Sequence, residues 1–497
     1  MAVVLAQVET PDIEWLGLTP HVVMAGAAVV LLTIVSLAGG RLPSWFASAW
    51  TVATGVAVVA TAVPVWLRVQ DDGPSSAVAG AIGVDGFSVF VIVVLAATVV
   101  LAALVADGFL VREGLDGPAF YVLLMLSAAG GMTMASANNL IVLFLGLEIL
   151  SLAVYVLVAM HLRREESLEA GIKYFVLGAF ASAFLLYGIA LVYGATGSIN
   201  LADIAVFLED NRLGDDGLLL AGLAMLLVGF GFKVAAVPFH AWTPDVYQGA
   251  PSPVVSYMAA GVKAAGFAAL TRVFVVAFGV RADDWQPVVF GLAAASVAVG
   301  GVLAIVQTDV KRILAYSSIS HAGFILVGVQ AATDEGTAGV LFYLAAYAAM
   351  AIGSFAVVTV VSGPGDEGTA IDSLRGLAAR RPALAGAFTV LLLSQAGIPF
   401  TAGFWAKFEV IAAAVDARSF WLAVIAMLGA VVAAYLYLRL VVTMYLEAPD
   451  SAAPRLRVPR GPAVAISIVV LFTLAFGVYP EPLANLANDA LPALTLP

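Results

Sequence analysis

Three lysines lie inside long apolar stretches of the sequence, where a charged side chain is costly. They are Lys233, Lys263 and Lys407, and the chain has only two others, Lys173 and Lys311, near the ends of such stretches. A charge at bilayer depth usually marks an ion or proton pathway. Lysine suits that task because its pKa drops readily on burial, whereas arginine stays protonated. These residues therefore predict proton transfer within a membrane.

One carboxylate, Glu148, lies near the middle of the apolar stretch 138–160. It must be protonated or paired across helices, because an isolated buried charge is too costly. A carboxylate beside a lysine favours loading of a proton, and separation of the two favours release. We therefore predict a switchable pair of Glu148 with a lysine, followed by a relay through Lys233, Lys263 and Lys407. The simpler alternatives are a pair that only locks two helices and lysines that reach the membrane surface, which fits Lys407 best.

The histidines and loop acids give weaker signals. His240 and His321 could bridge the lysines, since histidine titrates near neutrality, although a structural hydrogen-bonded role fits them as well. The four histidines are scattered, so we expect no metal site. We interpret the segment 309–312 (DVKR) as a helix start that anchors the chain with positive charge, and Asp85 and Asp245 as capping or loop residues.

The composition is that of a membrane protein. The chain is 62% hydrophobic and 11% charged, with a mean hydropathy of +1.05, whereas soluble domains carry roughly 25% charged residues. The absence of cysteine excludes disulfides and thiolate-held iron–sulfur clusters. The net charge of −11 argues against nucleic-acid binding. The first residues, MAVVLAQVETPD, have no basic region and do not resemble a cleaved signal peptide.

Apolar segments of membrane-spanning length follow one another along the whole chain. We predict an all-α polytopic membrane protein of about 14 transmembrane helices. The segments cover roughly 20–38, 46–68, 85–107, 118–136, 138–160, 168–196, 217–248, 251–278, 287–307, 312–331, 337–362, 382–415, 419–445 and 461–480. The seventh contains Pro238 and Pro244, and the twelfth contains Gly397, Pro399 and Gly403, so neither fits one straight helix.

Arginine and lysine in the loops predict the orientation. The odd-numbered loops hold most of them, namely Arg41, Arg112, Arg163, Arg164, Lys173, Lys311, Arg312, Arg375, Arg380, Arg381, Arg455, Arg457 and Arg460. The even-numbered loops hold Arg212, Arg281 and Arg418, with Arg68 and Arg272 at segment edges. Positive loops face the cytoplasm, so we predict that both termini lie on the outer side.

The two interrupted segments share a short motif. The seventh contains Val237-Pro238-Phe239 and the twelfth contains Ile398-Pro399-Phe400, each with an aromatic–lysine pattern nearby. The two segments cross in opposite directions by the loop count. Interrupted helices at matching places in inverted halves indicate a transport site, although helix-breaking residues are also common in membrane helices.

Three longer stretches carry a family resemblance. The stretches 233–267 (KVAAVPFHAWTPDVYQGAPSPVVSYMAAGVKAAGF), 307–324 (QTDVKRILAYSSISHAGF) and 397–408 (GIPFTAGFWAKF) resemble the antiporter-like membrane subunits of respiratory complex I. The sequences of 171–188 and 245–254 are most similar to those of the N-type subunits of bacterial NADH–quinone oxidoreductase. The resemblance covers roughly residues 85–445, and the combination of motifs is specific.

The resemblance implies a fold and a set of roles. The fold would comprise three N-terminal helices (1–117), a first repeat of helices four to eight (118–278), an inverted second repeat of helices nine to thirteen (287–445) and a C-terminal helix and tail (446–497), with helices 7 and 12 broken. Glu148 and Lys233 would be the coupled pair, Lys263 the central relay and Lys407 the terminal residue on the exit side. A lysine at position 407 argues against an M-type subunit, and the missing lateral helix argues against an L-type subunit.

The resemblance also implies partners. The chain would be one subunit of a proton-translocating NADH:quinone oxidoreductase in the bacterial plasma (inner) membrane. It would contact membrane lipid, subunits M, K and J, and the lateral helix of subunit L. NADH, FMN, iron–sulfur clusters and quinone would bind other subunits, so we expect no redox centre and no cofactor in this chain.

Other functions fit parts of the pattern. A subunit of a multi-subunit sodium/proton antiporter would share the same core. The feature that favours complex I over it is the similarity of 171–188 and 245–254 to N-type subunits. A membrane scaffold without transport would require all four intramembrane charges to be structural. A stand-alone secondary transporter would need a polar cluster of substrate size, which the sequence does not show.

Overall fold

The structure is a computed structural model that describes residues 13–115, 117–211, 217–449 and 456–495. The predictions for the first twelve residues and for Arg212 and Arg455 lie outside the described residues. The first half comprises α1 (Trp15–Ala38), α2 (Trp45–Asp72), β1 (Ser75–Ala77), β2 (Ile82–Val84), α3 (Gly86–Glu113), α4 (Gly117–Ser136), α5 (Leu140–Val158), α6 (Glu165–Thr196), α7 (Leu201–Asp210), α8 (Gly217–Val234), α9 (Thr243–Gly249), α10 (Ser252–Tyr257), the π-helix η1 (Met258–Val262), α11 (Lys263–Thr271) and the π-helix η2 (Arg272–Ala277).

The second half continues with the 3-10 helix η3 (Gly279–Arg281), α12 (Ala282–Ile305), α13 (Val310–Ala331), α14 (Asp334–Val361), the 3-10 helices η4 (Pro364–Asp366) and η5 (Ile371–Leu374), α15 (Leu377–Arg380), α16 (Pro382–Ala396), α17 (Ala402–Asp416), α18 (Phe420–Leu446), α19 (Arg460–Val478) and α20 (Glu481–Asn488). The all-α membrane class is confirmed. Within the described residues, 13 helical segments are long and apolar enough to cross a membrane. The expected twelfth segment, 382–415, consists of two helices, α16 and α17, which are separated by residues 397–401.

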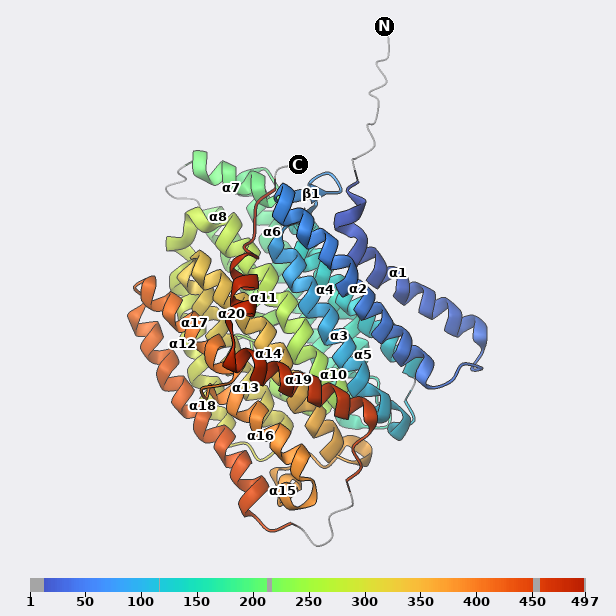
Figure 1. Ribbon diagram of the computed structural model, residues 1–497. Coiled ribbons are helices and arrows are strands. Elements are labelled where there is room, and N and C mark those ends of the chain that lie inside the picture. Colours follow the sequence, from blue (N-terminus) through green and yellow to red (C-terminus); the bar gives the residue numbers. More distant parts are fainter. Residues whose placement is uncertain (1–12, 116, 212–216, 450–455, 496–497) are drawn as a thin grey trace.

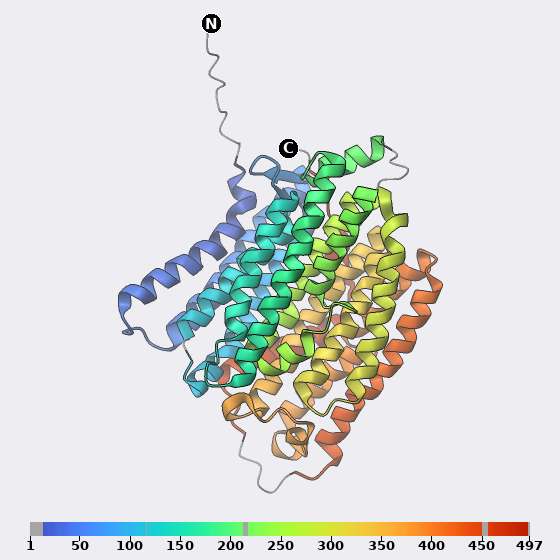
Figure 2. The same cartoon turned by 180° about the vertical axis from the view of Figure 1, so that it is seen from behind.

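The helices form one bundle with two loop ends (Figure 1, Figure 2). One end carries β1, α7 and the start of α3, and we call it the Asp85 end. The other carries α15 and the starts of α6, α10 and α13, and we call it the Lys311 end. The strands β1 and β2 form an antiparallel hairpin that the sequence pattern did not predict.

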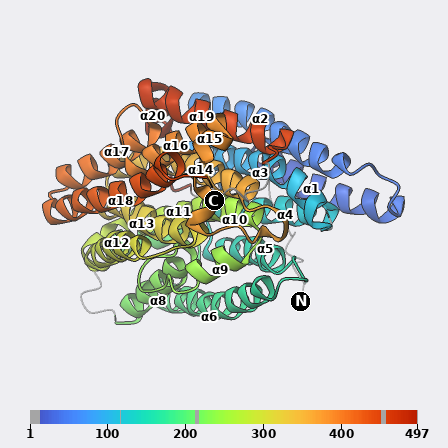
Figure 3. The same ribbon diagram turned by 90° about the horizontal axis from the view of Figure 1, so that it is seen from below.

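The helices at the centre of the bundle are buried on all sides. The spanning window of α14 is 100% buried, and that of α13 is 94% buried. Seen from below in Figure 3, α14 and α11 lie in the middle, while α6 and α8 lie at one margin and α19 and α20 at the other. A helix without a polar face must be enclosed by protein or lipid, so the sequence of α14 explains its central place.

Two interruptions and two π-helical turns shape the middle of the bundle. After α8 ends at Val234, the chain turns through the cis Val237–Pro238 peptide before α9 begins. The Phe239 ring packs against Gly231, where an added Cβ would lie 2.6 Å from Phe239 Cδ2. The π-helical turns η1 and η2 flank α11 on both sides. Such turns often occur at functional sites, and no sequence signal predicted them.

The expected capping residues behave differently from one another. Asp85 caps α3, since its carboxylate accepts a hydrogen bond from Ser88 N at 2.8 Å in a capping box. It also forms a buried ion pair with Arg272 at 2.8 Å. Asp245 lies in the first turn of α9 and pairs with Arg312 at 2.8 Å and with Lys173 at 3.0 Å. Asp85 is thus both a cap and a charge partner, while Asp245 connects α9 with α6 and α13.

Candidate functional site

The three central lysines lie on separate helices and are all buried. Lys233 is on α8, Lys263 begins α11 and Lys407 is on α17, and their exposures are 5%, 3% and 5%. Their ammonium groups therefore stay inside the protein, whereas a lysine that reached the membrane surface would be exposed at its tip. Each of them needs hydrogen-bond acceptors within the bundle.

The first lysine contacts the helix of Glu148. Lys233 Nζ donates a hydrogen bond to Ser151 Oγ at 2.8 Å. Ser151 lies three residues after Glu148 on α5, so both project from the same side of that helix. Glu148 Oε1 is buried without a hydrogen-bond partner in the described part of the chain. Lys233 thus bonds to the neutral hydroxyl of Ser151, and Glu148, one turn away on α5, has one carboxylate oxygen free to accept a hydrogen bond.

A glycine brings the first two lysines close together. An added Cβ on Gly266 would lie 3.3 Å from Lys233 Cγ and 3.2 Å from Val234 Cγ1. Gly266 follows Lys263 by three residues on α11, which is about one helical turn. The stem of Lys233 therefore packs against the same helix, one turn from Lys263.

The second lysine bonds to a serine of α13. Lys263 Nζ donates to Ser318 Oγ at 2.5 Å and to Ser318 O at 2.6 Å. It also lies 5.5 Å from the centre of the Tyr347 ring, within the range of a cation–π contact. The hydroxyls of Tyr247 and Tyr347 interact with the same serine. Ser318 is therefore shared by a lysine and two tyrosines in the centre of the bundle.

The third lysine bonds to the chain break between α16 and α17. Lys407 Nζ donates to Gln395 O at 2.9 Å and to Ala396 O at 3.0 Å. These carbonyls belong to the last turn of α16, where no further helical residue can bond to them. An added Cβ on Gly397 would lie 2.9 Å from Lys407 Cδ, so the glycine leaves room for the lysine stem. The break supplies both acceptors and space.

A hydrogen-bond network extends from this break toward α13. Gln395 accepts from Ser317 at 3.4 Å, and Ser317 also bonds to the Tyr437 hydroxyl. The Tyr437 hydroxyl bonds to His321 Nε2 at 3.2 Å, and His321 Nδ1 bonds to Tyr343 at 2.7 Å. Because Ser317 and Ser318 are neighbours, the network lies between Lys263 and Lys407. His321 is a member of it, whereas Ser317, Gln395 and Tyr437 were not predicted.

His240 stands apart from this network. It lies between α8 and α9, and its Nδ1 is buried without a hydrogen-bond partner in the described residues. The described contacts do not join it to any of the three lysines. Its predicted bridging role therefore has no direct support from the geometry.

The five lysines fall into two chemical classes. Lys233, Lys263 and Lys407 bond only to hydroxyls and carbonyls among the described residues. Lys173 and Lys311 each bond to a carboxylate. A neutral partner accepts a hydrogen bond from either form of the amine, whereas the buried Asp366 carboxylate would lose its charge partner if Lys311 lost a proton; the pair of Lys173 with Asp245 is exposed to solvent. The first three can thus change charge at lower cost.

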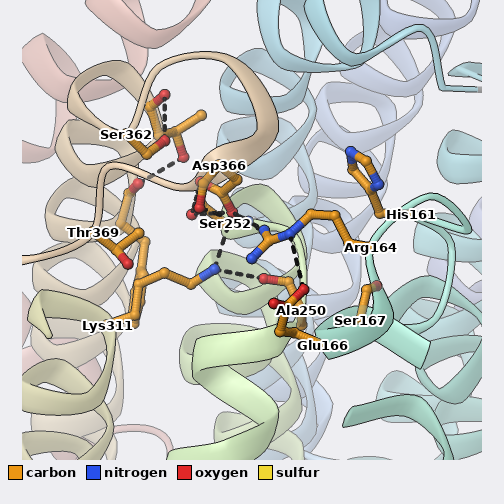
Figure 4. Close-up of polar contacts among 12 residues, drawn as sticks. His161, Arg164, Glu166, Ser167, Ala250, Ser252, Lys311, Ser362, Asp366 and Thr369 are labelled. Carbon is orange, nitrogen blue, oxygen red and sulfur yellow. Dashed lines mark hydrogen bonds and ion pairs between the residues drawn. The ribbon is translucent and has the colours of Figure 1, made fainter. Parts of the chain in front are cut away.

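Lys311 corrects the interpretation of the segment 309–312. Its side chain is 0% exposed and forms an ion pair with the buried Asp366 at 3.0 Å, so it does not anchor the surface (Figure 4). Asp309 does cap α13, since it accepts from Arg312 N at 2.9 Å. Asp366 was not predicted, because a lone acid in a Gly-rich turn gives no sign of a partner 55 residues away in the chain.

No cluster of three metal-ligating side chains occurs within residues 13–495 as described. Among the buried acids and histidines, Asp366 contacts Ser252 and Lys311, Asp85 contacts Arg272, and His321 contacts Tyr343. The contacts of the three central lysines are therefore hydrogen bonds to hydroxyl and carbonyl oxygens of neighbouring helices.

Comparison with known proteins gives a consistent family. Residues 137–433 match the family model described as "NADH:quinone oxidoreductase/Mrp antiporter, TM". The chain is similar to "NADH-quinone oxidoreductase subunit N" of Salinispora arenicola, with 40% identity over 98% of this chain and 99% of that protein. It is also similar to the protein of the same name from Acidothermus cellulolyticus, with 46% identity over 77% of this chain and 74% of that protein.

Solved structures show the same fold. A chain of "Respiratory complex I from Thermus thermophilus with bound Aureothin" superimposes with a TM-score of 0.79 and 34% identity, covering 94% of this chain and 99% of that chain. A chain of the "Mrp complex from Dietzia sp. DQ12-45-1b" superimposes with a TM-score of 0.84 at 22% identity, covering 96% and 97%. The second likeness concerns the fold alone.

Proposed function

The chain belongs to the NADH:quinone oxidoreductase/Mrp antiporter membrane-subunit family, and we propose that it translocates protons as one membrane subunit of an NADH-quinone oxidoreductase. The near-complete similarity to proteins named subunit N and the likeness to a complex I chain at 34% identity support this function. Oxidation of NADH and reduction of quinone would take place in other subunits, and this chain would carry no redox centre.

The observation that carries the proposal is that three buried lysines on separate helices all have neutral hydrogen-bond partners. Burial disfavours the charged form of a lysine and a neutral partner does not hold it charged, so a neighbouring charge can decide its protonation state. A lysine fixed by an ion pair lacks this property. The three lysines on α8, α11 and α17 are the residues that can load and release a proton in turn.

The roles follow the order in which the residues contact one another. Glu148 would hold a proton on Lys233 when its carboxylate is charged and favour release when it is neutral. Lys263 would take the proton next, because its helix packs against the stem of Lys233 at Gly266. The serine, tyrosine and histidine hydrogen bonds between Lys263 and Lys407 would carry it to the chain break.

The wider arrangement is part of the same proposal. We place helices four to eight in a first repeat and helices nine to thirteen in an inverted second repeat, with the interruptions after α8 and α16 at matching positions. The Lys311 end would face the cytoplasm, both termini would lie on the outer side of the bacterial plasma membrane, and subunits M, K and J and the lateral helix of L would be the neighbours. The excess of loop arginines at that end supports the orientation.

The test is Lys263→Ala in native membranes. NADH-driven proton pumping and quinone reductase activity would be followed together, with a native gel to verify that the complex assembles. We expect assembly with loss of both activities, because the relay is interrupted at its centre. Normal pumping in an assembled complex would exclude the relay and favour the scaffold. Sodium-dependent proton exchange without NADH would instead favour the sodium/proton antiporter.

A further inference from the structure

The turn after α14 places a carboxylate at the meeting point of several helices. Asp366 is 1% exposed and lies in the short helix η4 at the Lys311 end. Gly363 and Gly365, with φ of 68° and 74°, turn the chain sharply enough to direct the acid inward. The turn continues into Thr369, whose carbonyl accepts from Val310 N at 2.7 Å. The loop is thus joined directly to the start of α13.

The Asp366 carboxylate binds the first residues of two helices (Figure 4). Ser252, at the start of α10, donates its backbone N–H at 3.0 Å and its hydroxyl at 2.7 Å. Lys311, at the start of α13, donates its ammonium at 3.0 Å and also bonds to Ala250 O at 2.6 Å. Arg164, just before α6, is a more distant charge partner at 3.7 Å. One side chain therefore ties α10, α13 and the entry to α6 together.

The same two helices meet again at the central lysine. The helical segment that begins at Ser252 runs without interruption to Lys263, and α13 runs from Lys311 past Ser318. Lys263 and Ser318 form the hydrogen bond at the centre of the relay. Ser318 follows Lys311 by seven residues, about two turns of α13, so both lie on the same face of that helix. Lys263 follows Ser252 by eleven residues of one helical segment that includes the π-helix η1. The two segments are thus in contact at both the Asp366 carboxylate and the Lys263–Ser318 hydrogen bond.

A polar cavity opens beside this joint. It has a volume of about 420 Å³, and its lining includes Arg164, Asp245, Asp309, Asp366 and Thr369. Glu367, which follows Asp366, also lines the cavity but is exposed. Water can therefore reach the edge of the ion pair, while its centre stays enclosed by the helix starts.

We propose that Asp366 is a positioning residue for the relay: by binding Ser252 and Lys311, it holds the helices of Lys263 and Ser318 in register. This inference rests on the proposed function. Lys311 is then a fixed charge that serves the joint and takes no part in proton transfer. The joint lies between segments assigned to different repeats, so it also fixes how the two halves meet.

The experiment compares Asp366→Asn with Glu367→Gln in the assembled complex in native membranes. We expect Asp366→Asn to lower NADH-driven pumping by about tenfold or more, because small misplacements of a transferring group are costly. The pH profile of quinone reductase activity should shift, because Ser318 is no longer held in place beside Lys263. Glu367→Gln should match the unchanged protein in both. Unchanged pumping and an unchanged profile in Asp366→Asn would overturn the proposal.

Two further variants keep the test decisive if Asp366→Asn does not assemble. Asp366→Asn with Lys311→Met removes both charges, and Ser252→Ala removes only a neutral donor. The proposal predicts reduced pumping and a shifted pH profile in both, and wild-type behaviour in Ser252→Ala would overturn it. Lys263→Ala distinguishes failure of the proposed function from failure of the inference about Asp366. If Lys263→Ala pumps normally, the proposed function fails. If it abolishes pumping while the Asp366 and Ser252 variants are normal, only the present inference fails.

Discussion

Gly397→Ala should displace Lys407 while leaving the backbone nearly unchanged. Gly397 is the C-cap of α16 with φ of 87°, a conformation that costs an alanine about 1–2 kcal/mol. The added Cβ would lie 2.9 Å from Lys407 Cδ, and its three nearest neighbours are all atoms of that side chain. The flexible lysine must therefore move. Losing one charged hydrogen bond, at 2.9 Å or 3.0 Å now, costs about 1.5–3 kcal/mol.

Gly114→Ala is the matched control. Gly114 is the C-cap of α3 with φ of 63°, and an added Cβ there would meet nothing within 4 Å. Both variants carry the strain of an alanine at positive φ, and Gly397→Ala should lose about 1.5–3 kcal/mol more because it also loses a hydrogen bond of Lys407. Only Gly397→Ala should pump fewer protons per quinone reduced. A cost of about 1.4 kcal/mol lowers tenfold the population of the Lys407 conformation that bonds to the α16 carbonyls. If Gly397→Ala pumps as well as Gly114→Ala, the position of Lys407 does not matter and the reasoning is refuted.

Three shorter predictions concern the supporting contacts. Asp85→Asn should destabilise the complex by about 3–5 kcal/mol, because it leaves Arg272 as an unpaired buried charge; thermal unfolding should recover in the double variant with Arg272→Met, and equal losses would contradict the ion pair. Tyr437→Phe removes the hydroxyl shared by Ser317 and His321, so pumping should slow in an assembled complex, and an unchanged rate would exclude that route. Burial opposes ionisation of Asp366, but Lys311 and two serine hydrogen bonds lower its pKa below the ordinary value. Its stabilising effect should therefore persist from about pH 8 to pH 5 and disappear only below about pH 3.9 as the pH falls through the folded pKa; a stability difference between Asp366→Asn and the unchanged chain that shrinks already at pH 6 would disagree.

The sequence revealed the central lysines because the physics of burial acts on single residues. A lysine in a long apolar stretch is improbable unless it has a task, so Lys233, Lys263 and Lys407 could be selected without knowing any contact. The membrane-spanning class followed from the same hydropathy. Helix starts such as Asp85 and Asp309 were also recognisable, because capping depends on residues close in sequence.

The partners of these residues could not be predicted, because they depend on distant contacts. Ser318 and Tyr437 are ordinary polar residues of membrane helices, and only packing brings them to Lys263 and His321. Lys311 looked like a surface anchor because its partner, Asp366, lies in a turn after the next helix. The π-helical turns beside Lys263 have no signal in hydropathy, since they change the winding of a helix and leave its composition the same.

The most direct test of the relay is Lys263→Arg, assayed for NADH-driven proton pumping in complexes that a native gel shows to be assembled. Arginine keeps the positive charge but does not release its proton. If Lys263 transfers protons, Lys263→Arg should fail as completely as Lys263→Ala. If Lys263 only supplies a structural charge near Ser318, the arginine variant should pump at close to the normal rate, and the relay would be contradicted at its central residue.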